Sequence, residues 1–385
     1  MKVLEFLNAC LERGWTTEQA LTSLEERYAI KSRIYKDLGL VVLNYNQINS
    51  PKFDEITKEC RSLVLGLPVW DTTSQTPSGL VCLDGFYVVS RAFDRFFNHT
   101  EDPSQELDFS KVVFHDKLDG SLVSLFHHRG KWLYRTKSMI MPVDTINGLD
   151  VTWKDLIEEA LYIEGALPYL NKDWTFIFEV VSPYNRIVTR YEKPQAYLLA
   201  IRNNLNGDYA QAGYIKEACY FVDKWELPKV FIFDTVDSCL QGAKDRPNLE
   251  EGYVGYLNGV PVVKVKNPAY VVAHHIRGEG TLTPKRIVDL ILIGEVDEYL
   301  SIFPEDTEHF NPWLVAYDNV FRQVPIAFDE LNVLESQKEF AIGVMKGPTK
   351  KVSSLLFSMR KGLTLDEAWD KLSRNAKQST LEAMK

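Results

Sequence analysis

A lysine followed by a tight turn is the first feature of this sequence that could do chemistry. Lys117 stands in the stretch "HDKLDGSLVS", two residues before Asp119-Gly120, and the apolar segments "KVVF" and "SLVSLF" flank it. Both flanks have the composition of buried strands. A lysine at such a junction is either a surface residue whose stem covers apolar neighbours or a functional amine at the floor of a pocket. These residues alone leave both interpretations open.

A second group of charged residues lies in "EEGYVGYLNGVPVVKVKN" (250–267). Asn258-Gly259 predicts a two-residue hairpin turn of type I′, which needs positive φ at both positions. The pairs expected from this turn are Leu257 with Val260, Tyr256 with Pro261, Tyr253 with Lys264, and Glu251 with Lys266. Glu251, Tyr253, Lys264 and Lys266 would then share one face. That face is either a solvent-facing ladder or a carboxylate and two amines that converge on a phosphate-bearing ligand.

The bulk composition limits the class of protein. The 385 residues suffice for two domains, and a formal net charge of -9 argues against a protein that coats nucleic acid without selection. Two local stretches, 129–137 and 264–278, are nevertheless basic with interleaved aromatic residues, as a local anion site would be. Five scattered cysteines without a CxxC suggest neither a disulfide framework nor a cysteine-based zinc site. With no apolar leader or membrane-spanning run, we expect a cytoplasmic protein.

The elements that position these residues follow from hydrophobic periodicity. The apolar residues of 1–30 have helical spacing, with a capping box at "TTEQ" (16–19). From about 38 to 280 the hydrophobic pattern predicts mainly short apolar strands. A helical insert is expected at about 152–170. After 282 the texture is helical, with Thr283 as N-cap before Pro284 and a second capping box at Thr364 and Glu367. We therefore expect a β-rich catalytic domain at 1–280, with a helical N-terminal segment, and a helical domain at 281–385.

The order of the charged motifs resembles the covalent nucleotidyltransferase superfamily, which contains ATP-dependent ligases and mRNA capping enzymes. The amino-acid sequence is similar to that of the bacteriophage RNA ligase 1 family in five stretches: "ECR" (59–61), "KLDGSLVS" (117–124), "FEVVSPYNRIV" (178–188), "EGYVGY" (251–256) and "VKVKNPAYV" (263–271). The match spans about residues 45 to 271. This resemblance implies an α+β fold: an antiparallel-β-rich nucleotidyltransferase domain of the ATP-grasp-like ligase type, followed by an all-helical C-terminal domain.

The resemblance also implies a set of site residues, with Lys117 as the nucleophile that takes AMP from ATP. Asp119, Lys264 and Lys266 complete the implied catalytic group. The implied ATP-binding residues are Tyr45, Arg61, Arg95, Lys117, Lys137, Glu179, Glu251, Lys264, Lys266 and Tyr270. Glu179 and Glu251 are the implied Mg²⁺ carboxylates, directly or through water. The sequence departs from the family at Ser62, where glycine is usual, and at Arg95, which replaces a lysine. An acidic pair of the family's helical tail falls near Asp297-Glu298, where the alignment is loose.

The implied reaction explains why cations gather here. A phosphoramidate needs a neutral amine, and about one lysine in 2,500 is neutral at pH 7 when its pKa is about 10.4. We expect Lys264, Lys266 and a divalent metal to lower the pKa of Lys117 by repulsion. ATP and Mg²⁺, with Mn²⁺ as a substitute, are the implied cofactors. Lys117 would attack the α-phosphate, AMP would pass to an RNA 5′-phosphate, and a 3′-hydroxyl would displace AMP.

A DNA ligase, a capping guanylyltransferase and an RNA-binding module without catalysis are the alternatives to an RNA ligase. A DNA ligase or a capping guanylyltransferase carries a β-barrel domain after the "VKVK" strand, whereas 282–385 has helical texture. A catalytically silent RNA-binding module would not need the intact lysines and carboxylates. The paired histidines at 127–128 and 274–275 are poorly placed to chelate a metal, and no P-loop motif occurs. The expected partners are single-stranded RNA or broken tRNA ends, the expected role is RNA or tRNA repair, and a monomer is favoured. A viral protein would work in the host cytoplasm.

Overall fold

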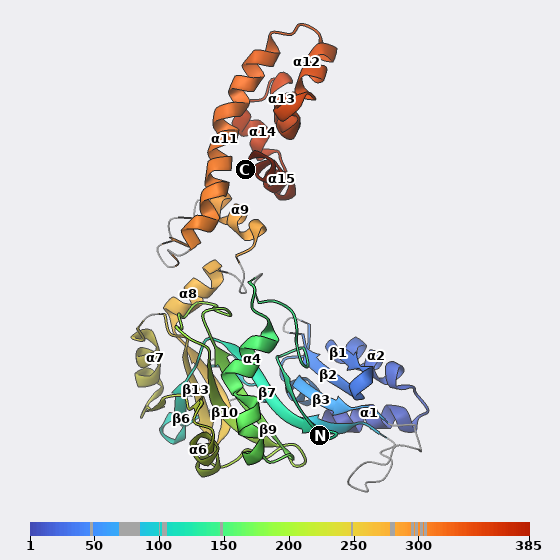
Figure 1. The fold of residues 1–385 in the computed structure, drawn as a ribbon, viewed down its shortest axis with the longest axis vertical. Helices are drawn as coiled ribbons and strands as arrows, with labels where there is room; N and C mark the ends of the chain where they lie inside the picture. The colour runs from blue at the N-terminus through green and yellow to red at the C-terminus, as the bar shows by residue number, and fades with distance from the viewer. Residues whose placement is uncertain are drawn as a thin grey trace. The chain divides into compact units, whose positions relative to one another are not determined.

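The computed structural model divides the chain into two compact units, Met1–His274 and His275–Lys385 (Figure 1). It describes residues 1–46, 49–68, 85–99, 101, 106–146, 149–247, 249–277, 282–293, 296, 299–300, 303 and 306–385, with side chains left out at 275–277 and 293. Both units together have the mixed α+β character that the sequence predicts. The assignment of separate functions to 1–280 and 281–385 stays a prediction.

The first unit begins with two helices packed against an antiparallel sheet (Figure 1). The helices are α1 (Lys2–Glu12) and α2 (Thr17–Tyr28), and the predicted capping box is present, with Thr16 and Gln19 bonded to each other's backbone. The strands of this first sheet, in spatial order, are β1 (Ile30–Tyr35), β2 (Leu40–Tyr45), β3 (Arg61–Gly66) and β4 (Tyr87–Ser90). The short helix α3 (Glu55–Glu59) leads directly into β3. Tyr45 and Arg61 therefore end and begin neighbouring strands.

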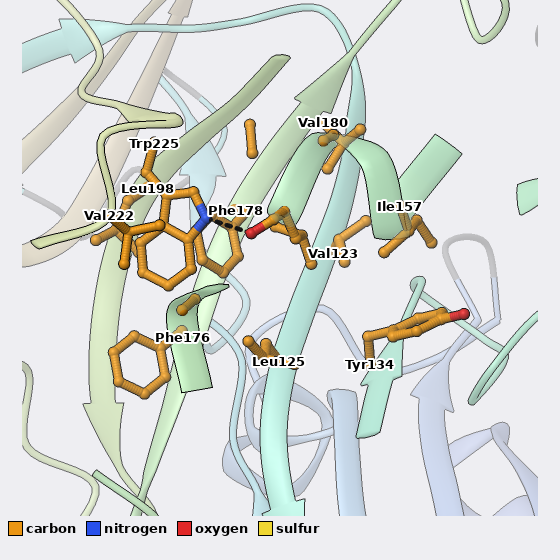
Figure 2. Close-up of a cluster of buried hydrophobic side chains, with 14 of the residues drawn as sticks. Val123, Leu125, Tyr134, Ile157, Phe176, Phe178, Val180, Leu198, Val222 and Trp225 are labelled. Atoms are coloured by element: carbon orange, nitrogen blue, oxygen red, sulfur yellow. Dashed lines mark hydrogen bonds between the residues drawn. The ribbon is translucent and has the colours of Figure 1, made fainter. Parts of the chain in front are cut away.

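The second sheet has one face in a hydrophobic cluster and the other toward the site. Its strands, in spatial order, are β11 (Trp225–Glu226), β10 (Gln195–Asn203), β9 (Trp174–Val181), β7 (Ser121–His128) and β8 (Lys131–Arg135). Figure 2 shows Val123, Phe178 and Trp225 within the cluster. Trp225 also donates its indole N–H to the carbonyl of Leu161 at 2.8 Å. Alternation along the strands turns Leu122 and Glu179, a cross-strand pair, to the opposite face.

Helices cover the clustered face of the second sheet. They are α4 (Trp153–Leu161), α5 (Ile163–Ala166), the 3₁₀ turn η3 (Leu167–Tyr169) and α6 (Ala212–Phe221). The first three confirm the helical insert expected at about 152–170. A capping box between Thr152 and Asp155 begins α4, so the chain leaves the strand texture with its first helical N–H groups bonded.

The third sheet carries the central motifs. Its strands, in spatial order, are β12 (Val230–Ile232), β6 (Val113–Asp116), β13 (Gly252–Leu257), β14 (Val260–Lys266) and β5 (Phe97–Asn98). Within the described residues, β14–β5 and β10–β11 are the parallel strand pairs. The helices α7 (Val236–Lys244) and α8 (Pro268–Arg277) flank this part of the chain, and α7 packs on the face of the sheet that holds Phe114, Tyr253 and Val263.

The predicted hairpin is right at its turn and wrong in its register. Asn258 and Gly259 have φ of 52° and 80°, and Leu257 pairs with Val260 as expected. Beyond the Tyr256–Pro261 pair, however, the register shifts by one residue. The observed pairs are Gly255 with Val263, Val254 with Lys264, Tyr253 with Val265, and Gly252 with Lys266. The extra residue is Val262, a β-bulge next to a proline that offers the ladder no N–H.

The register shift moves Tyr253 to the other face of the sheet. Its ring packs in the hydrophobic cluster with Phe114 and Val263 and is only 4% exposed. The predicted shared face of Glu251, Tyr253, Lys264 and Lys266 therefore loses its tyrosine, while the two lysines still share a face. Glu251 reaches them from just before β13 rather than from within it.

The second unit is helical throughout its described residues. Its helices are α9 (Pro284–Ile293), α11 (Thr307–Asn332), α12 (Gln337–Val344), the 3₁₀ helix η5 (Gly347–Val352), α13 (Ser353–Arg360), α14 (Leu365–Asp370) and α15 (Arg374–Met384). Both predicted starts are confirmed: Thr283 accepts the N–H of Arg286, and Thr364 forms a capping box with Glu367. Among the residues described, no helix is both long and apolar enough to cross a membrane.

Candidate active site

Residues from all three sheets of the first unit line a cavity of about 390 Å³. The sequence-predicted residues in its wall are Tyr45, Arg61, Arg95, Lys117, Glu179, Lys264 and Lys266. Three others, Asp119, Glu251 and Tyr270, are buried directly behind Lys117. Lys137 is exposed, with its ammonium 6.0 Å from the centre of the Tyr45 ring. The fold thus gathers residues that are up to 225 positions apart in the chain.

Lys117 directly follows β6 and is fixed from both its backbone and its side chain. Its N–H donates to the carbonyl of Gly252 at 2.9 Å, which continues the pairing of β6 with β13. Its Nζ lies 2.7 Å from Oε2 of Glu251, and the other oxygen of Glu251 lies 3.1 Å from Nζ of Lys266. The Glu251 side chain is 6% exposed and that of Lys117 is 22% exposed. One buried carboxylate therefore bridges two ammonium groups at the cavity wall.

The electrostatics of Lys117 differ from the sequence-based expectation. Burial lowers the pKa of the Lys117 ammonium, but attraction to Glu251 and then to Glu179 outweighs burial, so the pKa is raised above its usual 10.5. The prediction that nearby cations lower this pKa is wrong for the protein without ligand, because the carboxylates lie closer to Lys117 than the sequence suggested. Glu251 responds in the opposite sense: burial raises its pKa, and Lys117 and Lys266 more than offset that effect.

Asp119 organises the loop after Lys117 rather than lining the cavity. Its Oδ2 accepts the backbone N–H groups of Val188 and Thr189, both at 2.7 Å, and its Oδ1 accepts the hydroxyl of Tyr270 at 2.7 Å. The Asp119 N–H donates to the hydroxyl of Tyr191. These bonds tie the "KLDG" turn to the segment after β9 and to α8. Asp119 and Tyr270 are thus placed to hold the nucleophile's loop.

The cations of the cavity lie against aromatic rings. The Arg61 guanidinium and the Lys264 ammonium lie 5.1 Å and 4.7 Å from the centre of the Phe96 ring, and the Arg95 guanidinium lies 4.3 Å from that of Tyr45. One buried Nη1 atom of each arginine has no hydrogen-bond partner among the described residues. Unpaired buried N–H donors are costly, so the cavity wall is prepared for an anionic ligand.

Among the described basic side chains of the cavity, Lys264 has the most strongly shifted pKa. Burial first, and then repulsion from Arg61 and Lys117, lowers the pKa of Lys264 to about 6. Lys264 sits on β14 beside Asn98 of β5, and its own carbonyl accepts the N–H of His99 at 2.7 Å. Its backbone is thus fixed while its side chain is largely uncharged at neutral pH. An anion in the cavity would restore its charge.

Glu179 is the carboxylate that faces the cavity without an ion-pair partner in the described structure. Burial raises the pKa of Glu179 to about 8, and attraction to Lys117 does not offset the burial. Among the described residues, no group of three or more histidine, cysteine or acidic side chains is arranged to hold a metal ion. The side chain of His275 lies outside the described residues, as do Asp297 and Glu298.

Sequence reasoning missed part of the cavity wall, chiefly the irregular segment 91–96. Phe93 and Phe96 of this segment line the cavity together with Asn98, Glu101 and Asp116. The motif "AFDRFFN" gave a signal only for Arg95, because a segment without strand or helix has no periodicity from which burial can be inferred.

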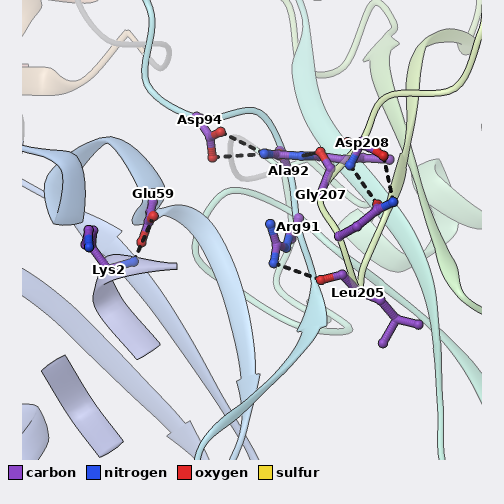
Figure 3. Close-up of polar contacts among 10 residues, drawn as sticks. Lys2, Glu59, Arg91, Ala92, Asp94, Leu205, Gly207 and Asp208 are labelled. Atoms are coloured by element: carbon purple, nitrogen blue, oxygen red, sulfur yellow. Dashed lines mark hydrogen bonds and ion pairs between the residues drawn. The ribbon is translucent and has the colours of Figure 1, made fainter. Parts of the chain in front are cut away.

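The segment 91–96 is held by side chains from the β9–β10 region. Arg202 donates from Nη1 and Nη2 to the two carboxylate oxygens of Asp94, at 3.0 and 2.7 Å, and from Nη1 to the carbonyl of Ala92 at 2.5 Å. Figure 3 shows these two acceptors beside Gly207, whose carbonyl accepts the Arg202 Nε–H at 2.9 Å. The same view shows Arg91 bonded to the carbonyl of Leu205. These bonds replace the strand ladder that the segment lacks.

Comparison with known proteins assigns the family. A family model described as RNA ligase matches residues 66–270, which is more than half of the chain. The chain belongs to the RNA ligase family. The matched range includes "KLDG", Glu179 and both lysines of β14, whereas Tyr45 and Arg61 of the cavity wall precede it.

Relatives of this chain include a viral and a phage protein. It is 30% identical over 364 residues to the "Putative bifunctional polynucleotide kinase/RNA ligase" of Autographa californica nuclear polyhedrosis virus. The match covers 89% of this chain and 48% of the relative. It is 26% identical over 333 residues to the "RNA ligase" of Rhodothermus phage RM378, with 68% and 75% coverage. The chain thus spans about half the length of the viral relative.

Among solved structures, the chain is similar to an "Archaeal ATP-dependent RNA ligase". The TM-score is 0.46 at 12% identity, and the likeness covers 70% of this chain and 66% of the other.

Proposed function

We propose that this chain is an ATP-dependent RNA ligase that joins RNA 5′-phosphate and 3′-hydroxyl ends through a lysyl-AMP at Lys117 and an RNA-adenylate. The observation that carries the proposal is the placement of the Lys117 amine at the wall of a cavity lined by Arg61, Arg95, Lys264 and Lys266. A lysine beside other basic side chains suits a nucleophile that attacks a polyphosphate, because those side chains offset the phosphate charge once Lys264 regains its proton.

The proposed first step is attack by the Lys117 amine on the α-phosphate of ATP. The bond from the α-phosphorus to the bridging oxygen breaks, and pyrophosphate leaves. Arg61, Arg95 and Lys264 would contact the phosphates, and Tyr45 with Lys137 would bound the nucleotide. Glu251 would direct the amine and take part in the loss of its proton, while Asp119 and Tyr270 hold the loop. RNA 5′-phosphate oxygen then displaces Lys117 from AMP, and a 3′-hydroxyl displaces AMP from the RNA.

A divalent cation fits this cavity through Glu179. The Glu179 carboxyl faces the cavity, burial raises its pKa to about 8, and a bound cation would favour its charged form. Glu251 has both oxygens engaged by lysines, so it would reach a metal through water. Mg²⁺, or Mn²⁺ in its place, prefers oxygen ligands, keeps several waters and would offset phosphate charge when bound.

The RNA substrate and setting are further parts of the proposal. We expect single-stranded RNA or broken tRNA ends as substrate, repair as the role, the 281–385 domain as an RNA-specificity domain, and a cytoplasmic monomer. The described residues of 282–385 are helical, so they offer no β-barrel of the kind that follows the lysine-bearing strand in DNA ligases and capping enzymes.

The test is labelling with ATP that carries ³²P at the α-phosphate, in the presence of Mg²⁺, followed by peptide mapping. We expect label on Lys117, loss of all label in Lys117→Ala, and normal label in Lys131→Ala, an exposed lysine outside the cavity. Unlabelled wild-type protein would refute ligase activity and leave the silent RNA-binding module. Label with GTP but not ATP would indicate capping chemistry.

Substrate preference is tested by offering 5′-phosphorylated single-stranded RNA, the same strand as DNA, and a nicked DNA duplex at one salt concentration. We expect the RNA to be sealed fastest. Faster sealing of the nicked duplex, or use of NAD in place of ATP, would contradict the proposal in favour of a DNA ligase.

A further inference from the structure

Arg246 is a buried arginine that the proposed mechanism does not use. It follows α7, its side chain is 5% exposed, and it is absent from the cavity wall. Its guanidinium forms ion pairs with Asp116 and, at 2.6 Å, with Glu250. The same group lies 4.6 Å from the centre of the Tyr253 ring. A cation buried between two carboxylates and an aromatic ring is held in one geometry.

Both carboxylates lie next to the proposed nucleophile and its partner in the chain. Asp116 directly precedes Lys117, and Glu250 directly precedes Glu251, the residue 2.7 Å from the Lys117 ammonium. One guanidinium therefore joins the end of β6 to the segment that enters β13. The Lys117 N–H bond to the Gly252 carbonyl is the backbone counterpart of this tie.

The position of Asp116 gives this tie an effect on the site itself. Asp116 borders the cavity beside Lys117, but its side chain is 12% exposed and lies on the sheet face of its cross-strand partner Tyr253, where Arg246 also lies. Without Arg246 it would be a buried carboxylate that has lost its main cation and keeps the weaker attraction of Lys229. We expect such a carboxylate to turn toward solvent and displace the end of β6, and with it the Lys117 N–H bond to Gly252 and the Lys117–Glu251 pair.

We propose that Arg246 is a positioning residue for the adenylation step, which holds Lys117 and Glu251 in register and neutralises Asp116. The inference rests on the proposed function, because it concerns the reaction of Lys117 with ATP. Arg246 acts through Asp116 and Glu250 and touches no ligand in the cavity.

The experiment separates the step that needs the Lys117 amine from the step that does not. Labelling of Lys117 by ATP is measured in Arg246→Met, Arg246→Lys and wild-type protein, together with sealing of RNA that already carries a 5′-adenylate. We expect Arg246→Met to adenylate about 100-fold more slowly at saturating ATP, the scale of a misplaced reacting group. Sealing of pre-adenylated RNA should change by less than about threefold, because Lys117 is not the nucleophile there.

Two further variants distinguish positioning from general loosening. Phe233→Leu changes the same hydrophobic cluster without touching a charge, so it should slow both steps equally, if at all. Asp116→Asn in the Arg246→Met background removes the uncompensated carboxylate and should recover about tenfold of the lost adenylation rate. Arg246→Lys keeps the charge but not the planar guanidinium, whose Nη2 pairs with both Asp116 and Glu250, so it should lie between wild type and Arg246→Met, and it serves alone if Arg246→Met does not fold.

The outcomes are separable. If wild-type protein takes no label from ATP, the proposed function fails and the role of Arg246 fails with it. If wild-type protein is labelled and Arg246→Met, or Arg246→Lys in its place, adenylates as fast, the positioning role is overturned. Parallel loss of both steps, or no recovery in the double variant, also overturns it, because Arg246 would then serve only the stability of the fold.

Discussion

Nζ of Lys117 and Oε2 of Glu251 lie 2.7 Å apart, while the second oxygen of Glu251 lies 3.1 Å from Nζ of Lys266. This arrangement keeps the Lys117 amine protonated in the protein without ligand, since the carboxylate raises its pKa. The Lys117 amine must therefore lose its proton once ATP is bound. An anionic ligand that draws Lys266 toward itself would leave Glu251 to accept the proton of Lys117.

Glu251→Gln tests this pair. The amide can no longer accept from two ammonium groups as an anion, so Lys117 loses its charged partner and its fixed direction. We expect the rate of Lys117 labelling by ATP to fall about 100-fold at pH 7, with the protein still folded. Thermal unfolding and sealing of pre-adenylated RNA are the controls. Labelling within threefold of wild type would mean that Glu251 serves only to pair with Lys266.

Lys264 predicts a proton uptake on ATP binding. Its pKa is lowered to about 6, so the side chain is mostly neutral at pH 7.5 in the free protein. The phosphates favour the charged form and raise this pKa, so the complex takes up about one proton and ATP affinity falls as pH rises above 6. Calorimetry with α,β-methylene-ATP, at pH 7.5 in buffers of different ionisation enthalpy, measures the uptake without the chemical step.

The matched variants for this prediction are neighbours on β14. Lys264→Gln should abolish the uptake and weaken nucleotide binding, whereas Val263→Ala should keep it, because Val263 points into the hydrophobic cluster on the other face. An unchanged proton uptake in Lys264→Gln would assign it to another group of the cavity. Equal loss of adenylation in the two folded variants would contradict the assignment of Lys264 to the cavity face.

The sequence predicted the cavity's charged residues better than their surroundings. The resemblance carried by the motif order implied that Lys117, Lys264 and Glu179 share one site, and all three line the cavity. It could not reveal that Glu251 lies closest to Lys117, since that depends on a backbone bond between Lys117 and Gly252. The sign of the Lys117 pKa shift was wrong for the same reason: local distances, not composition, decide it.

The hairpin shows a second limit of the sequence. The Asn258-Gly259 turn was predictable because two positive φ values leave few alternatives. The bulge at Val262 was not, since a bulge is selected by packing on both faces and by a proline that the ladder tolerates. Its effect reaches Tyr253, which alternation from the turn assigned to the wrong face. The irregular segment 91–96 was unreadable because side chains such as Arg202 hold it.

Arg202→Lys should weaken ATP binding more than it slows chemistry. Lysine cannot form the fork to Asp94 or keep the bonds to Ala92 and Gly207, so the segment that carries Phe93 and Arg95 would loosen. We expect the KM for ATP in Lys117 labelling to rise about tenfold, with the rate at saturating ATP changed by less than about threefold. The inverse pattern, an unchanged KM with a slower maximal rate, would show that the segment acts on the transition state.

Gly252→Ala should be the most damaging single-methyl change near the nucleophile. Gly252 has φ of +136°, and a Cβ there would lie 2.1 Å from the carbonyl oxygen of Val265, which is backbone and has no room to move. The matched control is Gly259→Ala at the hairpin turn, where φ is +80° but nothing lies within 4 Å of the added atom. The control isolates the free-energy cost of placing a residue with a Cβ at positive φ, about 1–2 kcal/mol.

We expect the free energy of unfolding to fall by about 2–4 kcal/mol in Gly252→Ala, from strain and clash together, and by about 1 kcal/mol in Gly259→Ala. Because the Gly252 carbonyl accepts the Lys117 N–H and Glu251 directly precedes it, the methyl group should also separate the Lys117–Glu251 pair. Adenylation in the folded fraction should therefore be lost in Gly252→Ala and kept in Gly259→Ala. Denaturant unfolding and ATP labelling on the same samples measure both effects. Similar unfolding energies in the two variants would mean that β14 can shift away from Gly252, and that the pair does not depend on this close approach.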